Sequence, residues 1–459
     1  MADTLKPRDG KEVEDVVRWA LDNDKPLELA GRGTKYGIGR PSQTDLTLDL
    51  SGLSDVTLYE PAELVLSARA GTPISEIEVL LDKHNQELAF EPIDYGPLLG
   101  VEANNGTIGG AIAANLSGPR RIKSGAARDH FLGFTAVTGR GETVKSGGRV
   151  VKNVTGYDLC KLLAGSWGTL GAMTDITIKV LPKAETEATV LIEGLDDATA
   201  CRAMTVAMGS AYDVSGAAHL PDHIAPWFDN VPESAASTLL RLEGFAPSVT
   251  HRRETLTAHM KGFGPVTLLD ERKSRDLWRS IRNVKPFAAE AVRTRPLWRI
   301  SVPPSRGHQI AGAITPAAQM FYDWAGGLIW VAMPLENEPD APAIRRAVAA
   351  VGGHATLVRA PAAVRASVDV FAPEDSAMGA LTKRVKESFD PKGLLNPGRM
   401  WAGVCRCKPR SLWHSYRTRN SHPPRRSCAP ACTADSVRRP VRLTFCSAMN
   451  SILPAVEFI

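Results

Sequence analysis

The chain has 459 residues, of which 43% are hydrophobic and 23% are charged, as in soluble globular proteins. It contains no run of about 18 apolar residues and begins without a secretory signal, which excludes a spanning helix and favours a cytoplasmic location. The formal net charge of +5 comes from residues 405–459, where 10 Lys and Arg stand against 2 Asp and Glu. This length predicts about two or three domains.

A glycine-rich loop follows the first predicted helix and strand. Apolar residues recur at helical spacing over Lys11–Asn23, and Pro26–Ala30 has the pattern of a short strand. The next residues, Gly31–Lys35, can hold phosphate through successive backbone N–H groups and two cations. They are not a P-loop or Rossmann fingerprint, because Arg40-Pro41 breaks the chain before a helix can start. An exposed loop without a ligand is an equally supported alternative.

A helix of small residues is the second candidate for phosphate binding. Thr107–Asn115 places Gly109 and Gly110 in its first turn, where free N–H groups and the helix dipole favour an anion. An earlier helix is predicted to start at Thr72 as N-cap, with Pro73 as its first residue. The strands predicted around these helices are Leu46–Leu50, Val65–Ala70, Phe131–Thr138 and Thr143–Lys145.

A second glycine-rich turn lies between a predicted helix, Tyr157–Ala164, and a predicted strand, Ala172–Leu181. It contains Gly165, Gly168 and Gly171, which cost backbone entropy unless the chain needs positive φ or a close contact. A tight turn and a support for a flat ligand explain this segment equally well.

The pattern changes after Pro182, where strands alternate with helices in a second α+β region of antiparallel character. The predicted strands are Ala188–Glu193, Leu239–Glu243, Leu297–Val302 and Leu328–Met333. The predicted helices are Ala198–Met208, Thr250–Met260, Ile344–Val351 and Met378–Ser388.

Five motifs in this order resemble the vanillyl-alcohol-oxidase (PCMH) superfamily of flavoproteins: Ala30–Thr34, Gly106–Gly110, Gly156–Leu159, Gly168–Gly171 and Asp390–Gly398. Two further segments, Lys152–Asp158 and Trp278–Phe287, resemble the E subunits of bacterial glycolate dehydrogenases. The resemblance implies an α+β fold. A PCMH-type FAD-binding domain of two α+β subdomains (1–182) would precede an α+β FAD-linked-oxidase C-terminal domain (183–404) and a basic tail (405–459).

The resemblance also implies residue roles around a non-covalent FAD. Relatives that bind flavin covalently through the first loop have a His at the position of Lys35, so no covalent bond is expected here. The loop Gly31, Arg32, Gly33, Thr34 and Lys35 would wrap the pyrophosphate, and Thr107, Gly109, Gly110 and Asn115 would flank the pyrophosphate and the flavin. The ring and ribityl chain would lie along Gly156, Asp158, Gly168, Thr169 and Leu170, with Asn396 approaching from the second domain.

As for function, the resemblance implies oxidation of glycolate, a small 2-hydroxy acid, to glyoxylate. The implied partners are the flavin-binding D subunit and the iron–sulfur F subunit of glycolate dehydrogenase, through which the cytoplasmic chain would reach the inner membrane. No catalytic residue is identifiable, because the His-x-His of hydroxy-acid oxidising relatives is missing. An assembly subunit with little flavin turnover and an autonomous FAD oxidoreductase for another hydroxy acid are the alternatives.

Other charged residues have a functional and a plainer interpretation. Lys152, Arg282 and Arg299 can hold a carboxylate, although ordinary surface or packing charges are the better supported explanation. His219 and His223 have helical spacing, but without a carboxylate motif or a nearby Cys two surface histidines are expected, and no metal. Arg128-Asp129 is expected to be a structural ion pair.

The tail differs in composition from the rest of the chain. Five of the seven cysteines lie there, in a spacing that fits no standard zinc or iron–sulfur site. Its basic charge suits a nucleic-acid arm, but interleaved aromatic residues and a recognisable module are missing, so no nucleic-acid partner is expected. Translation from a shifted reading frame is the favoured hypothesis, with disorder expected after Val404.

Overall fold

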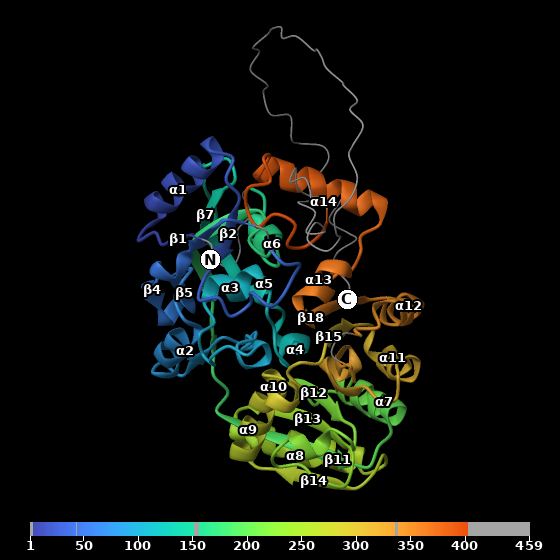
Figure 1. Cartoon of the computed structure of the whole chain (residues 1–459). Coiled ribbons are helices and arrows are strands. Elements are labelled where there is room, and N and C mark those ends of the chain that lie inside the picture. Colours follow the sequence, from blue (N-terminus) through green and yellow to red (C-terminus); the bar gives the residue numbers. More distant parts are fainter. Residues whose placement is uncertain (1–2, 43, 151–155, 336–337, 403–459) are drawn as a thin grey trace, which may run out of the picture. The chain divides into compact units, whose positions relative to one another are not determined.

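The computed structural model describes residues 3–42, 44–150, 156–335 and 338–402. By its internal contacts the chain divides into one unit, Met1–Arg406, and a second unit, Cys407–Ile459. The first unit contains every described helix and strand, most of which are labelled in Figure 1. The expectations for the tail and for Lys152 lie outside the described residues.

The chain begins with a small parallel sheet covered by one amphipathic helix. Helix α1 (Gly10–Asp22) starts where the Asp9 carboxylate accepts a hydrogen bond from the Glu12 N–H. Its apolar face buries Val13 and Val17 against the sheet. Three described strands lie in the order β1 (Asp3–Leu5), β3 (Leu46–Asp49) and β2 (Leu27–Ala30).

An antiparallel sheet forms the second layer of the FAD-binding region predicted from the sequence. Its five described strands are ordered β4 (Val56–Glu60), β5 (Val65–Arg69), β9 (Gly171–Lys179), β7 (Phe131–Thr138) and β8 (Thr143–Gly147). Short strands β6 (Gln86–Glu87) and β10 (Leu181–Pro182) pair beside it. The helices that share its core are α2 (Ile74–Asp82), α3 (Ile108–Ala113), α5 (Ala127–His130) and α6 (Leu159–Leu163).

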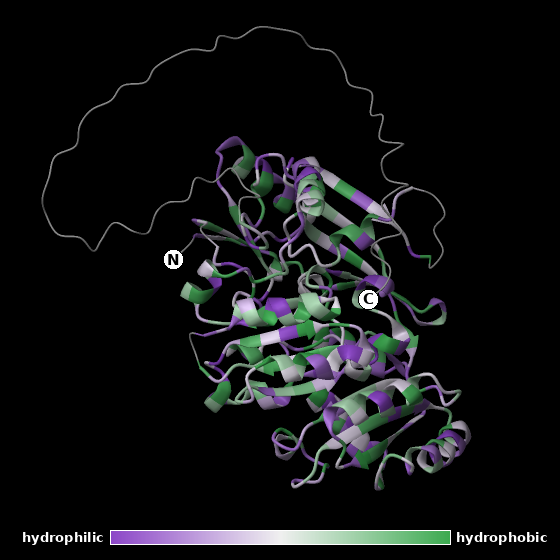
Figure 2. Ribbon diagram, turned by 90° about the vertical axis from the view of Figure 1, so that its right-hand side faces the viewer, coloured by the Kyte–Doolittle hydropathy of each residue, from purple (hydrophilic) through white to green (hydrophobic). Residues whose placement is uncertain are grey.

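A large antiparallel sheet dominates the rest of the described chain. In spatial order its eight described strands are β14 (Val266–Leu269), β11 (Thr186–Glu193), β13 (Ser237–Gly244), β12 (Gly216–Leu220), β16 (Gln319–Asp323), β17 (Leu328–Ala332), β15 (Leu297–Ser301) and β18 (His354–Arg359). The accompanying helices are α7 (Asp197–Met208), α8 (Ala246–Met260), α9 (Glu271–Arg282), α10 (Lys285–Ala288), α11 (Gly307–Ala313) and α12 (Ala341–Val351). Figure 2 shows green and purple bands on the helical ribbons, as expected of helices with one buried face.

Buried ion pairs join this sheet to the FAD-binding region. Arg241 on β13 donates to the Glu91 carboxylate with Nη1 to Oε1 at 2.9 Å, and Arg120 donates to Glu243 with Nε to Oε1 at 3.0 Å. Both arginines and Glu91 are less than 10% exposed. Since buried charges are tolerated only when paired, the loop that ends at Arg120 is held in place on the sheet.

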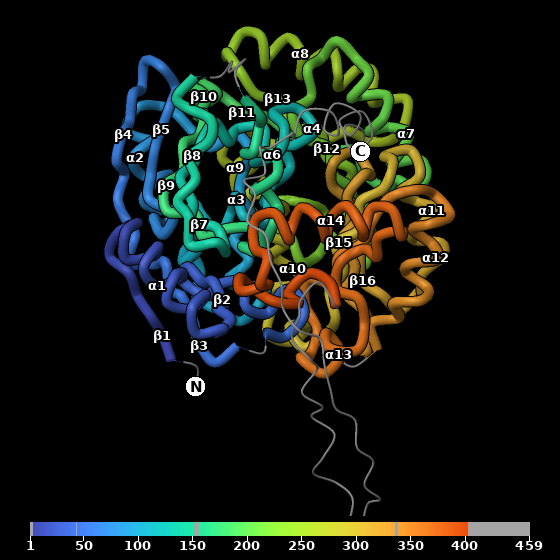
Figure 3. Tube along the Cα trace, turned by 90° about the horizontal axis from the view of Figure 1, so that it is seen from above, coloured from blue at the N-terminus to red at the C-terminus, as the bar shows by residue number. Residues whose placement is uncertain are grey.

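The last described segment returns to the first sheet. Helix α14 (Ser376–Phe389) lies beside α6 in Figure 3, and Lys386 at its end donates to the Thr169 carbonyl. Beyond it, the Leu27 N–H donates to the Leu394 carbonyl at 2.8 Å, and the Asn396 N–H donates to the Leu27 carbonyl at 2.9 Å. Residues from the end of the described chain thus complete the core around β2.

Several predicted elements need correction or completion. The N-cap of α2 is Pro73 rather than Thr72, whose hydroxyl instead bonds to the backbone N and O of Asp55, each at 3.0 Å. The sequence patterns did not predict strands β12, β14, β16 and β18 or helix α9. Strand β12 is buried at every position and has no polar alternation to mark it. The domain boundaries stay a prediction.

No described helix has both the length and the apolar composition needed to cross a membrane.

We predict that Lys386→Met destabilises the chain by about 3–5 kcal/mol, because it leaves the Asp390 carboxylate buried without its cation. The Lys386 and Asp390 side chains are 6% and 0% exposed, with Nζ to Oδ2 at 2.6 Å. The free energy of unfolding, measured by urea denaturation, tests this. Lys392→Met, which removes an ion pair whose members are 49% and 76% exposed, is the control and should cost about 1 kcal/mol or less. Equal losses in both variants would contradict the structural role of the buried pair.

Candidate functional site

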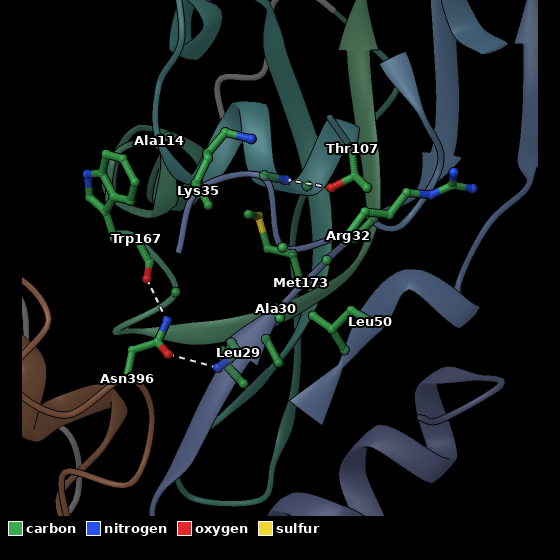
Figure 4. A pocket seen from close by; sticks show the side chains of 18 of the residues that line it. Leu29, Ala30, Arg32, Lys35, Leu50, Thr107, Ala114, Trp167, Met173 and Asn396 are labelled. Atoms are coloured by element: carbon green, nitrogen blue, oxygen red, sulfur yellow. Dashed lines mark hydrogen bonds between the residues drawn. The ribbon is translucent and has the colours of Figure 1, made fainter. Parts of the chain in front are cut away.

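The candidate site is a cavity between the two sheets of the FAD-binding region. Figure 4 shows it between strand β2 with its following loop, helix α3 and the turn that contains Trp167. One part of its wall is apolar and includes Leu29, Leu50, Ala114 and Met173. The other part is the loop Gly31–Lys35, so the cavity offers a charged end and a wall suited to flat rings.

The backbone of the loop is free to bind an anion. Among the described residues, none accepts a hydrogen bond from the N–H groups of Gly31, Arg32, Gly33, Thr34 or Lys35. Gly33 has φ +72°, which an L side chain would oppose. All five residues line the cavity, and successive backbone N–H groups of this kind suit acceptor oxygens such as those of a diphosphate.

The first turn of α3 does not have the free donors that the sequence predicts. The N–H groups of Ile108 and Gly109 donate to the Thr72 and Ala70 carbonyls at 2.9 and 2.8 Å. The Gly110 N–H donates to the Thr107 hydroxyl at 3.2 Å. Gly109 serves packing instead, since a Cβ there would lie 2.7 Å from the Ala70 carbonyl oxygen.

Lys35 supplies a cation at the charged end of the cavity. Its Nζ donates to the Thr34 hydroxyl at 3.2 Å. Burial lowers its pKa to about 8, with the Asp94 carboxylate opposing and the Arg399 guanidinium adding to the shift. A desolvated ammonium is less favourable without an anion beside it, so this position also fits a negatively charged ligand.

Asn396 joins three segments of the cavity wall. Its side-chain oxygen accepts from the Leu29 N–H at 2.8 Å, and its side-chain nitrogen donates to the Trp167 carbonyl at 2.7 Å (Figure 4). Arg399, three residues later, donates to the Lys35 carbonyl at 2.8 Å. These bonds fix the loop and the glycine turn from the C-terminal side, which explains why Asn-Pro-Gly-Arg belongs to the site.

The structure brings ten of the fifteen predicted site residues to this cavity: Gly31, Arg32, Gly33, Thr34, Lys35, Thr107, Gly109, Gly110, Gly168 and Asn396. The other five lie elsewhere. The Asn115 side-chain oxygen accepts a hydrogen bond from the Arg128 N–H. Asp158 is the N-cap of α6, and Gly156, two residues earlier in the chain, has φ +81°. Thr169 and Leu170 line a neighbouring cavity beside α14. The cofactor roles of all fifteen stay predictions.

Sequence reasoning missed several wall residues, among them Trp167, Met173 and Arg399. Trp167 has φ +53°, and its ring packs against Phe371 at 5.4 Å between centroids. Nothing in a single sequence marks such apolar contacts. Arg399, however, stands in the Asn-Pro-Gly-Arg motif and could have been included on that ground.

The other histidines and charged residues singled out in the sequence take part in contacts within the fold. The expectation of two surface histidines is wrong for His219, which is fully buried on β12 with Nδ1 2.9 Å from the Thr238 hydroxyl. Arg128 and Asp129 form the expected ion pair at 3.7 Å, and Arg282 pairs with Glu78 at 3.5 Å. Within the described ranges, no three His, Cys, Asp or Glu side chains are grouped to hold a metal ion.

Comparison with known proteins agrees with this fold. Residues 2–147 match the family of the FAD binding domain. The chain is 33% identical to glycolate oxidase subunit GlcE of Escherichia coli K12 over 84% of its length and 95% of that protein. It is 25% identical to glycolate oxidase subunit GlcD of Bacillus subtilis over 87% of its length and 88% of that protein.

Among solved structures, an alkyldihydroxyacetonephosphate synthase superposes with a TM-score of 0.64 at 15% identity, over 86% of this chain and 75% of that one. This likeness confirms the predicted α+β fold with a PCMH-type FAD-binding region. FAD is therefore the cofactor, and the chain belongs to the GlcE family of FAD-linked oxidoreductases.

Proposed function

We propose that this chain is the FAD-binding subunit of a glycolate dehydrogenase complex that oxidises glycolate to glyoxylate. The observation that carries the proposal is the 33% identity that extends over 95% of the GlcE protein. The second resemblance, to a GlcD protein, supports a complex in which two related flavin chains work together. Electrons would leave through an iron–sulfur partner, and these partners would attach the cytoplasmic chain to the inner membrane.

The cavity supports a definite placement of the cofactor. The free N–H groups of Gly31–Lys35 and the Lys35 ammonium would hold the diphosphate, and the wall near Trp167 would receive the ring system. When bound, the flavin supplies the acceptor for the hydride of the substrate carbon. The protein's own contribution is to bind, orient and shield that group.

The lining also supports non-covalent binding. No His or Cys occurs among the described residues that line the cavity, and Lys35 stands where covalently flavinylated relatives have His. His and Cys are the side chains that most often form a covalent link to flavin, so their absence from the described lining favours a non-covalent cofactor.

The proton acceptors used most often for a substrate hydroxyl, carboxylates and imidazoles, do not occur among the described residues of this lining. Among its described residues no Asp, Glu or His occurs, so no member has the carboxylate or imidazole that general base catalysis uses most. This favours a chain that works with partner proteins. An assembly role and an autonomous oxidoreductase activity on another hydroxy acid remain the two competing functions.

A visible absorption spectrum of the purified chain, before and after acid precipitation, tests the cofactor placement. A flavin band that moves to the supernatant is expected, and a band retained in the pellet would contradict non-covalent binding. Anaerobic addition of glycolate to the chain alone and together with its GlcD-type and iron–sulfur partners tests the function. Bleaching that requires the partners supports the proposal, whereas bleaching of the isolated chain supports autonomy.

We predict that FAD affinity falls as pH rises through about 8, because Lys35 loses in this range the proton that makes it attractive to the diphosphate. Below this pH the ammonium is charged and FAD binds most strongly. Above it the FAD affinity falls by a factor that approaches about tenfold per pH unit. The dissociation constant is measured at pH 7 and 9 by quenching of FAD fluorescence. Lys35→Gln should bind weakly at both pH values, and Lys35→Arg should show no change between them. An unchanged constant in the wild type would contradict the role of Lys35.

A further inference from the structure

A strained turn on the large sheet presents an indole ring to the FAD-binding region. Trp324 and Ala325, in the turn Trp324–Gly326 between β16 and β17, have φ +51° and +58°. The Trp324 N–H donates to the Asp323 carboxylate at 2.7 Å, and its ring N–H donates to the Gly118 carbonyl at 2.9 Å. Left-handed conformations of non-glycine residues cost free energy and persist where the surroundings impose them.

Two arginines from different parts of the fold rest on this ring. Arg121, which begins the short helix α4 (Arg121–Ser124), places its guanidinium carbon 4.6 Å from the Trp324 ring centroid. Arg299, on β15, lies 4.9 Å from it. Within the described part of the chain, neither guanidinium donates a hydrogen bond or forms an ion pair with a carboxylate. Both residues are partly exposed.

A phenol and an imidazole lie on the same part of the sheet. Strand register places Arg299 opposite Trp330 on β17, and the Tyr95 ring meets Trp330 edge-on with centroids 6.4 Å apart. On the other side of β15, His354 of β18 stands opposite Ser301, two residues from Arg299. The four side chains therefore come from the FAD-binding region (Tyr95 and Arg121) and from the sheet (Arg299 and His354).

The electrostatics of this group favour a bound anion. Burial and the neighbouring Arg299 lower the pKa of Arg121 to about 10. Desolvation and the charges of Arg299, Arg121 and Arg345 lower the pKa of His354 to about 4. Burial raises the pKa of Asp323 to about 7, so this acid offsets only part of the positive charge. Two close cations without a full counter-charge are costly unless a ligand supplies one.

We propose that Arg121 and Arg299, aligned on Trp324 and bordered by Tyr95 and His354, form a binding site for a small carboxylate anion. This proposal rests on the proposed function, for which it names the position of the 2-hydroxy acid. A planar guanidinium binds a carboxylate through two parallel hydrogen bonds.

The anion site is separate from the lining of the FAD cavity. None of its residues lines that cavity. The link is Trp167, which lines the cavity and packs on Phe371, while Val370 accepts a hydrogen bond from the Leu357 N–H of β18 at 2.8 Å. An indirect chain of contacts thus runs from the cavity wall to the strand that bears His354.

The test uses oxalate, a small carboxylate that is not a hydroxy acid, titrated calorimetrically into the FAD-loaded chain. We expect binding by the wild type and a dissociation constant raised about tenfold or more in Arg121→Gln and Arg299→Gln. Arg279→Gln, at a surface arginine 64% exposed in an ion pair with Asp276, is the matched control and should bind like the wild type. Wild-type affinity in the double variant Arg121→Gln/Arg299→Gln, or no binding by the wild type, would overturn the site.

A second measurement needs no variant and so remains decisive if the substitutions impair folding. Phenylglyoxal modifies accessible arginines, and oxalate should protect Arg121 and Arg299 but not Arg279 when modified peptides are quantified by mass spectrometry. Equal modification with and without oxalate would refute the site. Failure of the proposed function would appear separately, as a missing flavin band or as the absence of glycolate-dependent bleaching with the partner proteins. Oxalate binding, in contrast, reports only on the site formed by the two arginines.

Discussion

The FAD-binding region depends on a buried ion pair that is supplied from the far end of the described chain. Lys386 and Asp390 lie within 2.6 Å of each other, and the Asp390 carboxylate also accepts from the N–H groups of Leu394 and Leu395. Separating a buried cation from its buried anion is strongly unfavourable, so this segment is held in place. Its fixed course places Asn396 between strand β2 and the Trp167 turn.

The cofactor cavity consequently relies on three segments that are distant in sequence. The glycine loop offers donors for a ligand, since its backbone N–H groups have no acceptor among the described residues. Its carbonyls close local turns, because Gly33 accepts from the Tyr36 N–H and Lys35 accepts from the Ile38 N–H. Asn396 and Arg399 hold it from outside through the backbone of Leu29 and Lys35. Such preorganisation leaves the donors free for the ligand while their positions are already determined.

Binding of the cofactor and recognition of a second anion involve different parts of the fold. Backbone donors and one lysine serve the diphosphate, whereas the proposed carboxylate site uses guanidinium groups on an indole ring. The buried pairs Arg120–Glu243 and Arg241–Glu91 hold the loop before Arg121 on the sheet that bears Arg299. The relative position of the two arginines therefore depends on the same contacts that join the sheet to the FAD-binding region.

The sequence by itself determined the elements with clear periodicity, such as α1 and β7, and the glycine loop with its donors, because spacing and glycine content are local properties. It also carried the family motifs and the Lys35 substitution. Only the tertiary structure decided that the α3 donors are already used, that His219 is buried and that Arg299 meets Arg121 on Trp324. These facts depend on contacts between residues far apart in the chain, which no local pattern encodes.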